Sequence, residues 1–508
     1  MRTKKAVKNI VSSLIYQIVS IVCGLIAPRL ILTTYGSSYN GVVASATQLL
    51  GMISILTLGI AGATRVALYK TLAANDVLGT SRIMKSNKRY MRRVAVTLAA
   101  YAVVLMIVYP YISHNDLAKN EVALLIGIVS ISSIAEYFFG ISNATLLSAA
   151  QSGYVSSTIN IIARIANTVA IFLLVRIGAS VFVVYLASSL VFFISPAVLN
   201  HIVHRKFSLI SDCEPDDSAL KQRGAVALHS VANIVHNNTD LVLLTVFFDA
   251  KVISVYTVYY LVVGKIKSLM SVFTSGMEGA FGDMWAKKEY EHFNRNFETY
   301  EYVLYAFAAI VFSCVGLLML PFLSRYTAGV TDINYIRPTL TVLITVAEGM
   351  HCVRQPYLTI VQATGNYEAT KIGAMMEAVI NIVLSLVLVQ VIGLNGVIVG
   401  TLAANLIRTT QFAMFSSKNL IHRSVAAVFK RFAWLLADSG TIIALSALLT
   451  RRLSFAPGWM GWVTEAVIVF FIACVITVLY SLAFYKKDLM YLADKLLKTG
   501  FRKNRNGV

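Results

Sequence analysis

Long apolar runs separated by short polar stretches dominate the hydrophobic pattern of this chain. Each run approaches the roughly 20 residues that an α-helix needs to cross the hydrocarbon core of a bilayer. The pattern therefore predicts an all-α, polytopic membrane protein with about fourteen transmembrane helices. The predicted spans are residues 10–34, 42–68, 94–113, 122–149, 155–175, 179–201, 224–247, 252–274, 302–324, 339–363, 371–392, 394–416, 432–450 and 462–485.

Composition excludes a soluble globular protein. Of the 508 residues, 57% are hydrophobic and only 13% are charged, and the mean hydropathy is +0.71. The predicted external loops are short, about four to sixteen residues, so no extramembrane catalytic domain is expected. The five cysteines lack CxxC spacing, so neither a disulfide framework nor a metal site is predicted. They are Cys23, Cys213, Cys314, Cys352 and Cys474.

The net charge of +20 is a topology signal. Most of the Lys and Arg residues fall on the side of the membrane that holds both ends of the chain, including the 82–93 cluster and the 486–505 tail. The positive-inside rule makes this side cytoplasmic. We therefore expect anionic lipid headgroups, and no nucleic acid, as the partners of the basic surface. The opposite side holds Lys119, Arg176, Lys251, Arg325, Arg337, Arg451 and Arg452.

The two halves of the chain resemble each other. Ala135-Glu136 recurs as Ala347-Glu348, and three further anchors follow at an offset of about 212 residues. Because this offset spans six helices, both copies insert in the same orientation, and a binding cavity is expected between them. The predicted organisation is an N-lobe at 1–210, a C-lobe at 211–420 and two additional helices with a basic cytoplasmic tail at 421–508. The other anchors pair Pro110 with Pro321, Gly153 with Gly365, and Gly178 with Gly393.

A polar stripe follows the seventh span. Spacings of four, three and four residues place its members on one helical face, with a neighbouring asparagine beside them. In lipid such a stripe lines a cavity, or it joins neighbouring helices through hydrogen bonds. The stripe consists of His229, Asn233, His236 and Asp240, with Asn237 beside it.

Charged residues also lie deep within other apolar spans. Each costs about 2.5–3.5 kcal/mol at a helix centre on insertion scales, so such residues face water or pair with one another. Arg164 and Arg354 are candidate ligands for an anionic substrate. Glu136, Glu348, Glu377 and Asp240 are candidate ion-coupling or gate residues. Glu377 lies next to the repeat counterpart of Arg164, so these two either pair as a gate or serve different ligands.

Two arginines in the first two spans complete the predicted site. Arg29 follows Pro28, which loosens the first helix, and Arg65 lies toward the cytoplasmic end of the second span. The planar guanidinium fork suits phosphate and pyrophosphate. The alternative is that Arg29 snorkels to the interface and that Arg65 is a positive-inside anchor.

Enzyme signatures are missing from the sequence. It contains no GxxxxGK[ST] phosphate loop, no HExxH and no GxSxG. We therefore expect a transporter that is not an enzyme and holds no cofactor or metal.

Several short motifs resemble those of bacterial polysaccharide flippases of the multidrug/oligosaccharidyl-lipid/polysaccharide exporter (MOP) superfamily. The resemblance implies two lobes, alternating access, and movement of undecaprenyl-pyrophosphate-linked oligosaccharide to the outer leaflet of the bacterial inner membrane. It also implies that Arg29 and Arg65 engage the pyrophosphate, and that a polymerase and glycosyltransferases are partners. The matching motifs are Ser12-Ser13-Leu14, Pro28-Arg29-Leu30, Tyr39-Asn40-Gly41, Leu58-Gly59-Ile60 with Arg65, and Asn238-Thr239-Asp240.

Three other functions remain open from sequence. A multidrug or cation antiporter of the same superfamily would need an acid-rich cavity, and counting the deep charges does not exclude it. A peptidoglycan lipid II flippase would share the diphosphate chemistry. A membrane polysaccharide polymerase is disfavoured because these enzymes carry a large external loop.

Overall fold

The computed structural model describes residues 2–210, 212–217 and 238–494. These residues form helices and no β-strand, apart from one isolated bridge between His114 and Asp249. The chain divides into two compact units. Unit 1 comprises Met1–Lys265 with Gly329–Asn334, and unit 2 comprises Ile266–Ala328 with Tyr335–Val508.

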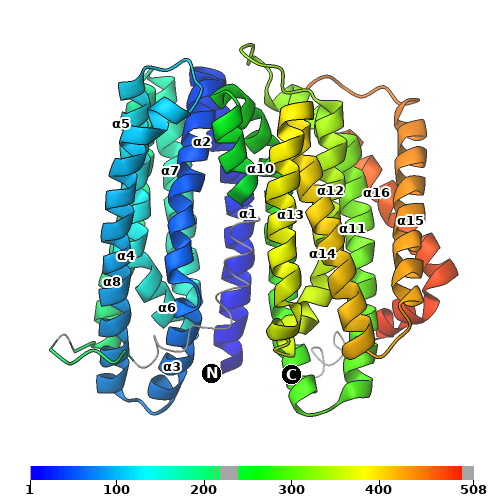
Figure 1. Ribbon diagram of the computed structural model, residues 1–508, viewed down its shortest axis with the longest axis horizontal. Coiled ribbons are helices and arrows are strands. Elements are labelled where there is room, and N and C mark those ends of the chain that lie inside the picture. Colours follow the sequence, from blue (N-terminus) through cyan, green and yellow to red (C-terminus); the bar gives the residue numbers. More distant parts are fainter. Residues whose placement is uncertain (1, 211, 218–237, 495–508) are drawn as a thin grey trace, which may run out of the picture. The chain divides into compact units, whose positions relative to one another are not determined.

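Unit 1 contains the first eight numbered helices, the helical residues Asn238–Phe247 and the first part of α10 (Figure 1). Helix α5 packs against both α4 and α8, and α1 packs against α7. The elements are α1 (Arg2–Tyr35), α2 (Ser37–Gly51), η1 (Met52–Thr57), α3 (Ile60–Ala73), α4 (Val77–Ile112), α5 (Lys119–Ala135), η2 (Glu136–Gly140), α6 (Ile141–Ala149), α7 (Gly153–Arg176), α8 (Val181–Phe207) and α10 (Ala250–Ala286).

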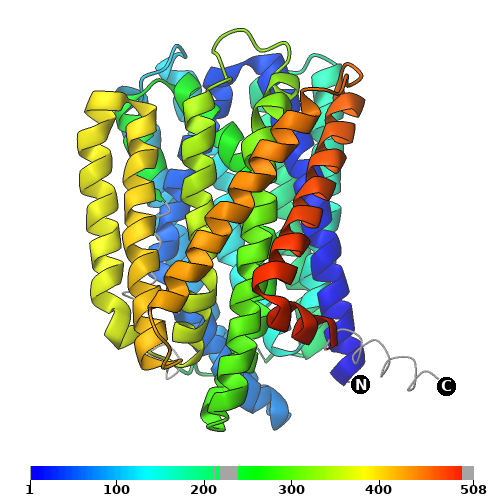
Figure 2. The same ribbon diagram turned by 90° about the vertical axis from the view of Figure 1, so that its right-hand side faces the viewer.

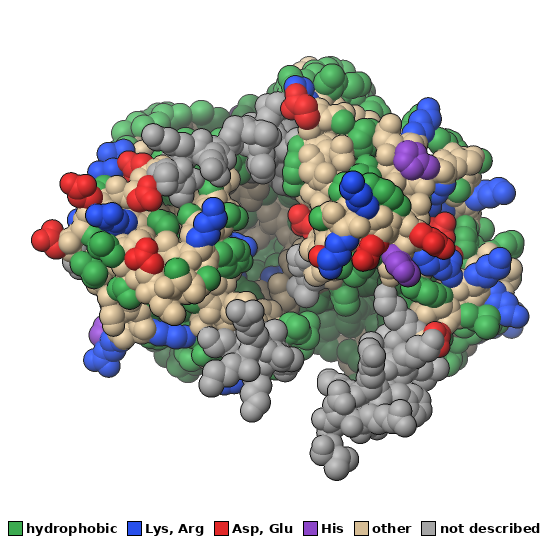
Figure 3. All heavy atoms as spheres, turned by 90° about the horizontal axis from the view of Figure 1, so that it is seen from below, with side chains coloured by type: hydrophobic (Ala, Val, Ile, Leu, Met, Phe, Trp, Pro, Cys, Tyr) green, Lys and Arg blue, Asp and Glu red, His purple; other side chains and the backbone are tan. Residues whose placement is uncertain are grey.

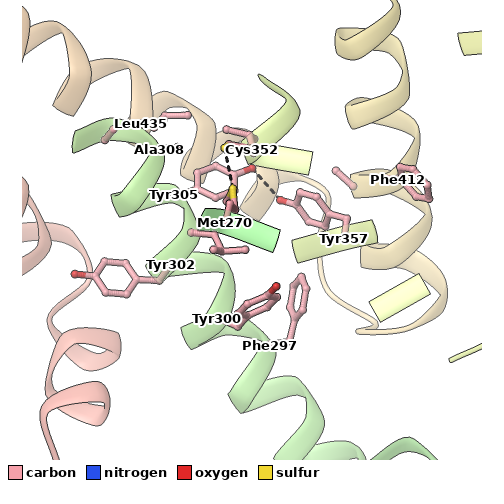
Figure 4. Close-up of a cluster of buried hydrophobic side chains, with 14 of the residues drawn as sticks. Met270, Phe297, Tyr300, Tyr302, Tyr305, Ala308, Cys352, Tyr357, Phe412 and Leu435 are labelled. Carbon is pink, nitrogen blue, oxygen red and sulfur yellow. Dashed lines mark hydrogen bonds between the residues drawn. The ribbon is translucent and has the colours of Figure 1, made fainter. Parts of the chain in front are cut away.

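Unit 2 contains the second part of α10, the helices α11 to α16 and the helical residues 486–494. Helices α15 and α16 both pack against α11, as Figure 2 shows. Aromatic side chains fill much of the core, where the Tyr305 and Tyr357 hydroxyls are 3.0 Å apart (Figure 4). The helices are α11 (Tyr290–Tyr326), α12 (Pro338–Ala363), α13 (Tyr367–Ile392), α14 (Leu394–Asn419), α15 (Ala426–Thr450) and α16 (Trp459–Phe484).

The prediction of an all-α membrane protein is confirmed. Eleven helices of the described chain are long and apolar enough to cross a membrane. Helices α12 and α14, of 26 residues each, coincide with the predicted spans 339–363 and 394–416. The predicted span 224–247 is described only from Asn238, where residues Asn238–Phe247 are helical. The chain is a multi-pass membrane protein.

Two predicted spans are interrupted helices. The span 42–68 consists of α2, a 3₁₀ turn and α3, and Gly59 before α3 has a φ of 75° that favours glycine. The span 122–149 contains a π-helical turn at Glu136–Gly140 between α5 and α6. Turns of this kind inside helices frequently mark functional positions.

One packing order occurs in both units. In unit 1, α4 packs on α5, and α8 packs on both α5 and α7; in unit 2, α11 packs on α12, and α14 packs on both α12 and α13. A duplication would produce this repetition. The compact units, however, divide at Lys265 and Ile266 inside α10. The lobe boundary at 210/211 lies beside residues outside the description, so it stays a prediction.

Candidate functional site

Most of the polar stripe predicted in the seventh span cannot be placed. His229, Asn233, His236 and Asn237 lie outside the described residues. Asp240, the last member, is buried and accepts a hydrogen bond of 3.1 Å from the Tyr256 hydroxyl on α10. Asp240 therefore lies at a helix interface of unit 1, which was one of the two alternatives for the stripe.

Arg164 lies in a pocket of aromatic side chains at the middle of α7. Its guanidinium carbon is 5.9 Å from the ring centre of Tyr16 on α1 and 5.8 Å from that of Phe192 on α8. Both distances are within the range of cation–π attraction. These contacts hold the charge at this depth without a carboxylate.

A second cation lies near Arg164. Lys265 on α10 donates a hydrogen bond of 3.4 Å to the Ser20 hydroxyl on α1. It is close enough to Arg164 for the two positive charges to repel each other. Gly24 leaves room for it, since a Cβ there would be 3.1 Å from the Lys265 ammonium nitrogen. Within the described part of the chain, neither Arg164 nor Lys265 forms an ion pair with Asp or Glu. We call Arg164 and Lys265 the unit 1 cation pair.

The other predicted site residues of unit 1 differ in exposure. Arg29 is half-buried in α1, one residue after Pro28, whereas Arg65 is exposed on α3. Glu136 begins the π-helical turn, and its carboxylate would be 2.6 Å from a Cβ at Gly140. Because Gly140 has no side chain, the Glu136 carboxylate can pack against the backbone of the turn.

In unit 2, the predicted candidates Arg354 and Glu377 form a buried ion pair between α12 and α13. Arg408 on α14 joins them, with its Nε 3.5 Å from Glu377 Oε2. The exposed side-chain fractions of Arg354, Glu377 and Arg408 are 4%, 11% and 3%. We call these three residues the unit 2 network. Glu377 thus pairs with two arginines of its own unit.

Neighbouring polar groups complete the unit 2 network. Arg354 Nη2 is 2.9 Å from His351 Nδ1, and Arg408 donates 2.8 Å and 2.5 Å hydrogen bonds to the Thr370 carbonyl and to Gln411. His351, one turn before Arg354 on α12, therefore helps to hold the Arg354 guanidinium. Removing one partner from such a buried group leaves an uncompensated charge.

Glu348 has a basic partner that sequence spacing did not identify. Its carboxylate is 3.0 Å from Lys267 Nζ on α10, and the Glu348 side chain is 3% exposed. Lys267 and Glu348 are distant in sequence, so only the packing of α10 against α12 could reveal this pair.

Sequence reasoning also missed a buried acid in the first half of α11. Glu301 is fully buried and accepts 2.5 Å and 2.7 Å hydrogen bonds from Arg423, and a 2.5 Å bond from the Tyr357 hydroxyl. Arg431 Nε is 3.3 Å away. Burial alone would lower the pKa of Arg423, but the bonds to Glu301 raise it above its ordinary value. This cluster fastens α15 and the segment before it to α11.

Comparison with known proteins identifies the fold. No protein-family model matches the sequence, and no curated protein matches it. A solved structure of the lipid II flippase MurJ in an inward closed conformation has a TM-score of 0.69, with 15% identity over 94% of this chain and 99% of that chain. The chain has the fold of a known transporter class.

Two multidrug transporters also have a fold similar to that of this chain. An inward-facing MATE family transporter of the MOP superfamily has a TM-score of 0.61 and 13% identity over 81% of this chain and 96% of that one. The MATE multidrug transporter DinF-BH also has a TM-score of 0.61, with 14% identity over 82% and 95%. At these identities the likeness concerns the fold, and substrate has to be argued from side chains.

Proposed function

We propose that this protein is a flippase that moves a polyprenyl-diphosphate-linked oligosaccharide from the cytoplasmic to the outer leaflet of a bacterial inner membrane, for surface polysaccharide assembly. The observation that carries the proposal is the unit 1 cation pair. Arg164 and Lys265 are two positive charges at mid-helix depth that no carboxylate neutralises among the described residues. Charges at this depth are kept where a ligand of opposite sign binds.

A diphosphate suits this pair better than other anions. Arginine presents a planar fork of donors to phosphate oxygens, and lysine adds a compact charge with three donors. Tyr16 and Phe192 beside Arg164 offer faces on which sugar rings can pack. In the proposal, Arg29 and Arg65 attract the diphosphate, Arg164 and Lys265 hold it, and the polyprenyl tail remains in lipid.

Alternating access is the proposed mechanism, because transporters with this fold expose a site to one side of the membrane at a time. Glu348 and Glu377 each contact a basic side chain, so we assign them a structural role. Glu136, on the π-helical turn, and Asp240 are the proposed coupling residues. A polymerase and glycosyltransferases are proposed partners, and both termini are proposed to be cytoplasmic.

The buried acids of α11, α12 and α13 argue against a multidrug extruder of cations. Such a transporter needs a carboxylate available to a positively charged drug. In α11, α12 and α13 the three buried acids Glu301, Glu348 and Glu377 each contact Lys or Arg. The buried acids of these helices therefore offer a cation no uncompensated charge.

A lipid II flippase is the second candidate. The observation in its favour is the likeness to MurJ over 94% of this chain. Its substrate would place the same diphosphate against the unit 1 cation pair, with a different headgroup beyond it. The two candidates therefore differ in the sugar moiety and share the anion site.

Reconstitution in liposomes tests the proposal. Polyprenyl-diphosphate oligosaccharide, lipid II and a phospholipid, each with a fluorophore, are incorporated, and dithionite quenching of the outer leaflet reports flipping. We expect flipping of the oligosaccharide lipid by the wild type. Loss of a charge-assisted hydrogen bond costs about 1.5–3 kcal/mol, so Arg164→Gln and Lys265→Gln should each slow it about tenfold or more.

Arg176→Gln is the matched control, because Arg176 is exposed at the last position of the same helix and stacks on Phe172. It should flip at the wild-type rate. Wild-type rates for both pair variants would refute the anion site. Flipping of lipid II alone would favour the second candidate, and export of a cationic dye without flipping of either lipid would refute both.

A further inference from the structure

A cavity of unit 1 has a lining that includes neither Arg164 nor Lys265. It is a groove of about 1050 Å³ in unit 1, formed by the first half of α4, the end of α8 and the segment after α8. Among the described residues that line it, five are Lys or Arg of α4 and none is Asp or Glu. We call it the basic groove; its cations are Lys85, Lys88, Arg89, Arg92 and Arg93.

These five residues follow each other at helical spacing. Positions 85, 88/89 and 92/93 form a single face over two turns, which is about 10 Å at 1.5 Å per residue. His204 of α8 faces the row, with its Nε2 3.4 Å from Lys88 Nζ. The His204 Nε2 accepts a hydrogen bond from Lys88, because the other ring nitrogen, Nδ1, is 2.8 Å from the Asn200 carbonyl and donates to it. The cations of the α4 row repel one another, so an anion bound along the row would relieve this repulsion. Figure 3 views the molecule from the end at which α4 begins, where Lys and Arg side chains gather on each unit.

The Asp217 carboxylate pairs with one cation of the basic groove. Asp217 is 3.0 Å from Arg89 and accepts a hydrogen bond from Ser86. The segment that carries it is held to α4 by the Ile210 amide, which donates to Ser81, and by the Asp216 amide, which donates to the Arg82 carbonyl. Asp217 therefore neutralises part of the charge of the groove from its edge.

The remaining lining is apolar, which indicates an amphiphilic ligand. Met84, Val96, Leu209, Ile210 and Pro215 lie among the cations. The apolar part of α4 starts near residue 94, so the basic row lies where headgroups meet the predicted cytoplasmic face. A soluble phosphate would use the cations alone, whereas a phospholipid would also cover the apolar side chains.

We propose that the basic groove is a binding site for an anionic phospholipid, whose phosphate contacts Lys88 and Arg92 while its glycerol and upper acyl chains cover Met84, Val96 and Ile210. The site is separate from the flipping site and does not depend on the proposed function. The groove joins the first half of α4 to the end of α8, so a bound lipid would stabilise the packing of these two helix ends.

Native mass spectrometry of the full-length protein in neutral detergent tests the site, with phosphatidylglycerol as the probe and phosphatidylcholine as the neutral lipid. We expect at least one phosphatidylglycerol to bind several-fold more tightly than phosphatidylcholine. Juxtamembrane cations contribute about 1 kcal/mol each, so Lys88→Gln/Arg92→Gln should weaken binding by tenfold or more. Asp217→Asn should strengthen it, because it removes the carboxylate that pairs with Arg89 at the edge of the groove.

Arg451→Gln/Arg452→Gln is the control of equal charge change, since both residues are exposed and outside the groove; it should leave the tight binding intact. Melting temperatures confirm that all variants fold. Equal binding of the two lipids, or wild-type binding by Lys88→Gln/Arg92→Gln, would overturn the proposal. So would full displacement by inorganic pyrophosphate, or a polyprenyl-diphosphate lipid that binds in its place. Arg164→Gln should still bind phosphatidylglycerol, which separates this site from the flipping site.

Discussion

In unit 1, Arg164 and Lys265 lie half-buried among aromatic and hydroxyl side chains, whereas in unit 2, Arg354 and Arg408 close on one carboxylate, Glu377. The two arrangements differ in how far they offset the desolvation free energy of the buried charges. A buried pair offsets its desolvation through Coulomb attraction, while a cation beside aromatic rings recovers only part of it. In the unit 2 network the opposite charges join α12, α13 and α14, whereas the ligand-binding role of the unit 1 cation pair is the part that we propose.

The largest effect is expected where two cations depend on one buried acid. Glu301→Gln should destabilise the protein by about 3–5 kcal/mol, because Arg423 would remain buried without a counter-charge and Arg431 would keep only the more distant Asp488 carboxylate, 3.8 Å away. The melting temperature of the purified protein is the measurement. Glu368→Gln, which breaks an exposed pair with Lys371, is the control and should cost about 0–1 kcal/mol. Equal melting temperatures of the two variants would contradict the structural role of Glu301.

A double-mutant cycle tests the unit 2 network. Glu377→Gln leaves two buried arginines and should cost about 3 kcal/mol or more, whereas Arg354→Gln leaves the neutral pair of Glu377 and Arg408 and should cost less. Adding Arg354→Gln to Glu377→Gln should restore about 1–3 kcal/mol. If Glu377 were instead a coupling residue, Glu377→Gln would abolish transport at an unchanged melting temperature.

In contrast to Glu377, the two residues of the unit 1 cation pair should contribute little to the stability of the protein. Arg164→Gln and Lys265→Gln remove a cation–π contact or a single hydrogen bond, so each should change stability by only about 1 kcal/mol. Melting temperatures of both variants, compared with that of Glu377→Gln, measure the contrast. A loss as large as that of Glu377→Gln would show that the pair supports the fold, and any slower flipping would then be indirect.

The smallest effect concerns pH at the edge of the basic groove. A hydrogen bond from Ser86, and then the charge of Arg89, lower the pKa of Asp217. The stability from this contact is therefore present above the ordinary Asp pKa of about 3.9 and is lost as the pH falls through the lowered value. Because the Asp217 carboxylate stays ionised between pH 7 and 5, hydrogen-exchange rates at the Ile210 and Asp216 amides should not change over this range, after correction for intrinsic exchange rates. Asp217→Asn should raise exchange at both amides at pH 7.

The outline of the fold could be predicted from the chain because apolarity is a local property. Spans such as 155–175 and 371–392 correspond to α7 and α13, since bilayer thickness fixes how long an apolar helix must be. The break at Gly59 and the π-helical turn at Glu136 were not predicted. They depend on how neighbouring helices pack around these residues.

The sequence by itself determined the membrane class, the approximate spans and the depth at which Arg164, Arg354 and Glu377 lie. Only the tertiary structure decided their partners: Glu377 pairs with Arg354 and Arg408, Glu348 with Lys267, and Arg164 lies near Lys265. The physical reason is that hydropathy sums along one helix, whereas an ion pair depends on the rotation and packing of two helices that can be far apart in the chain.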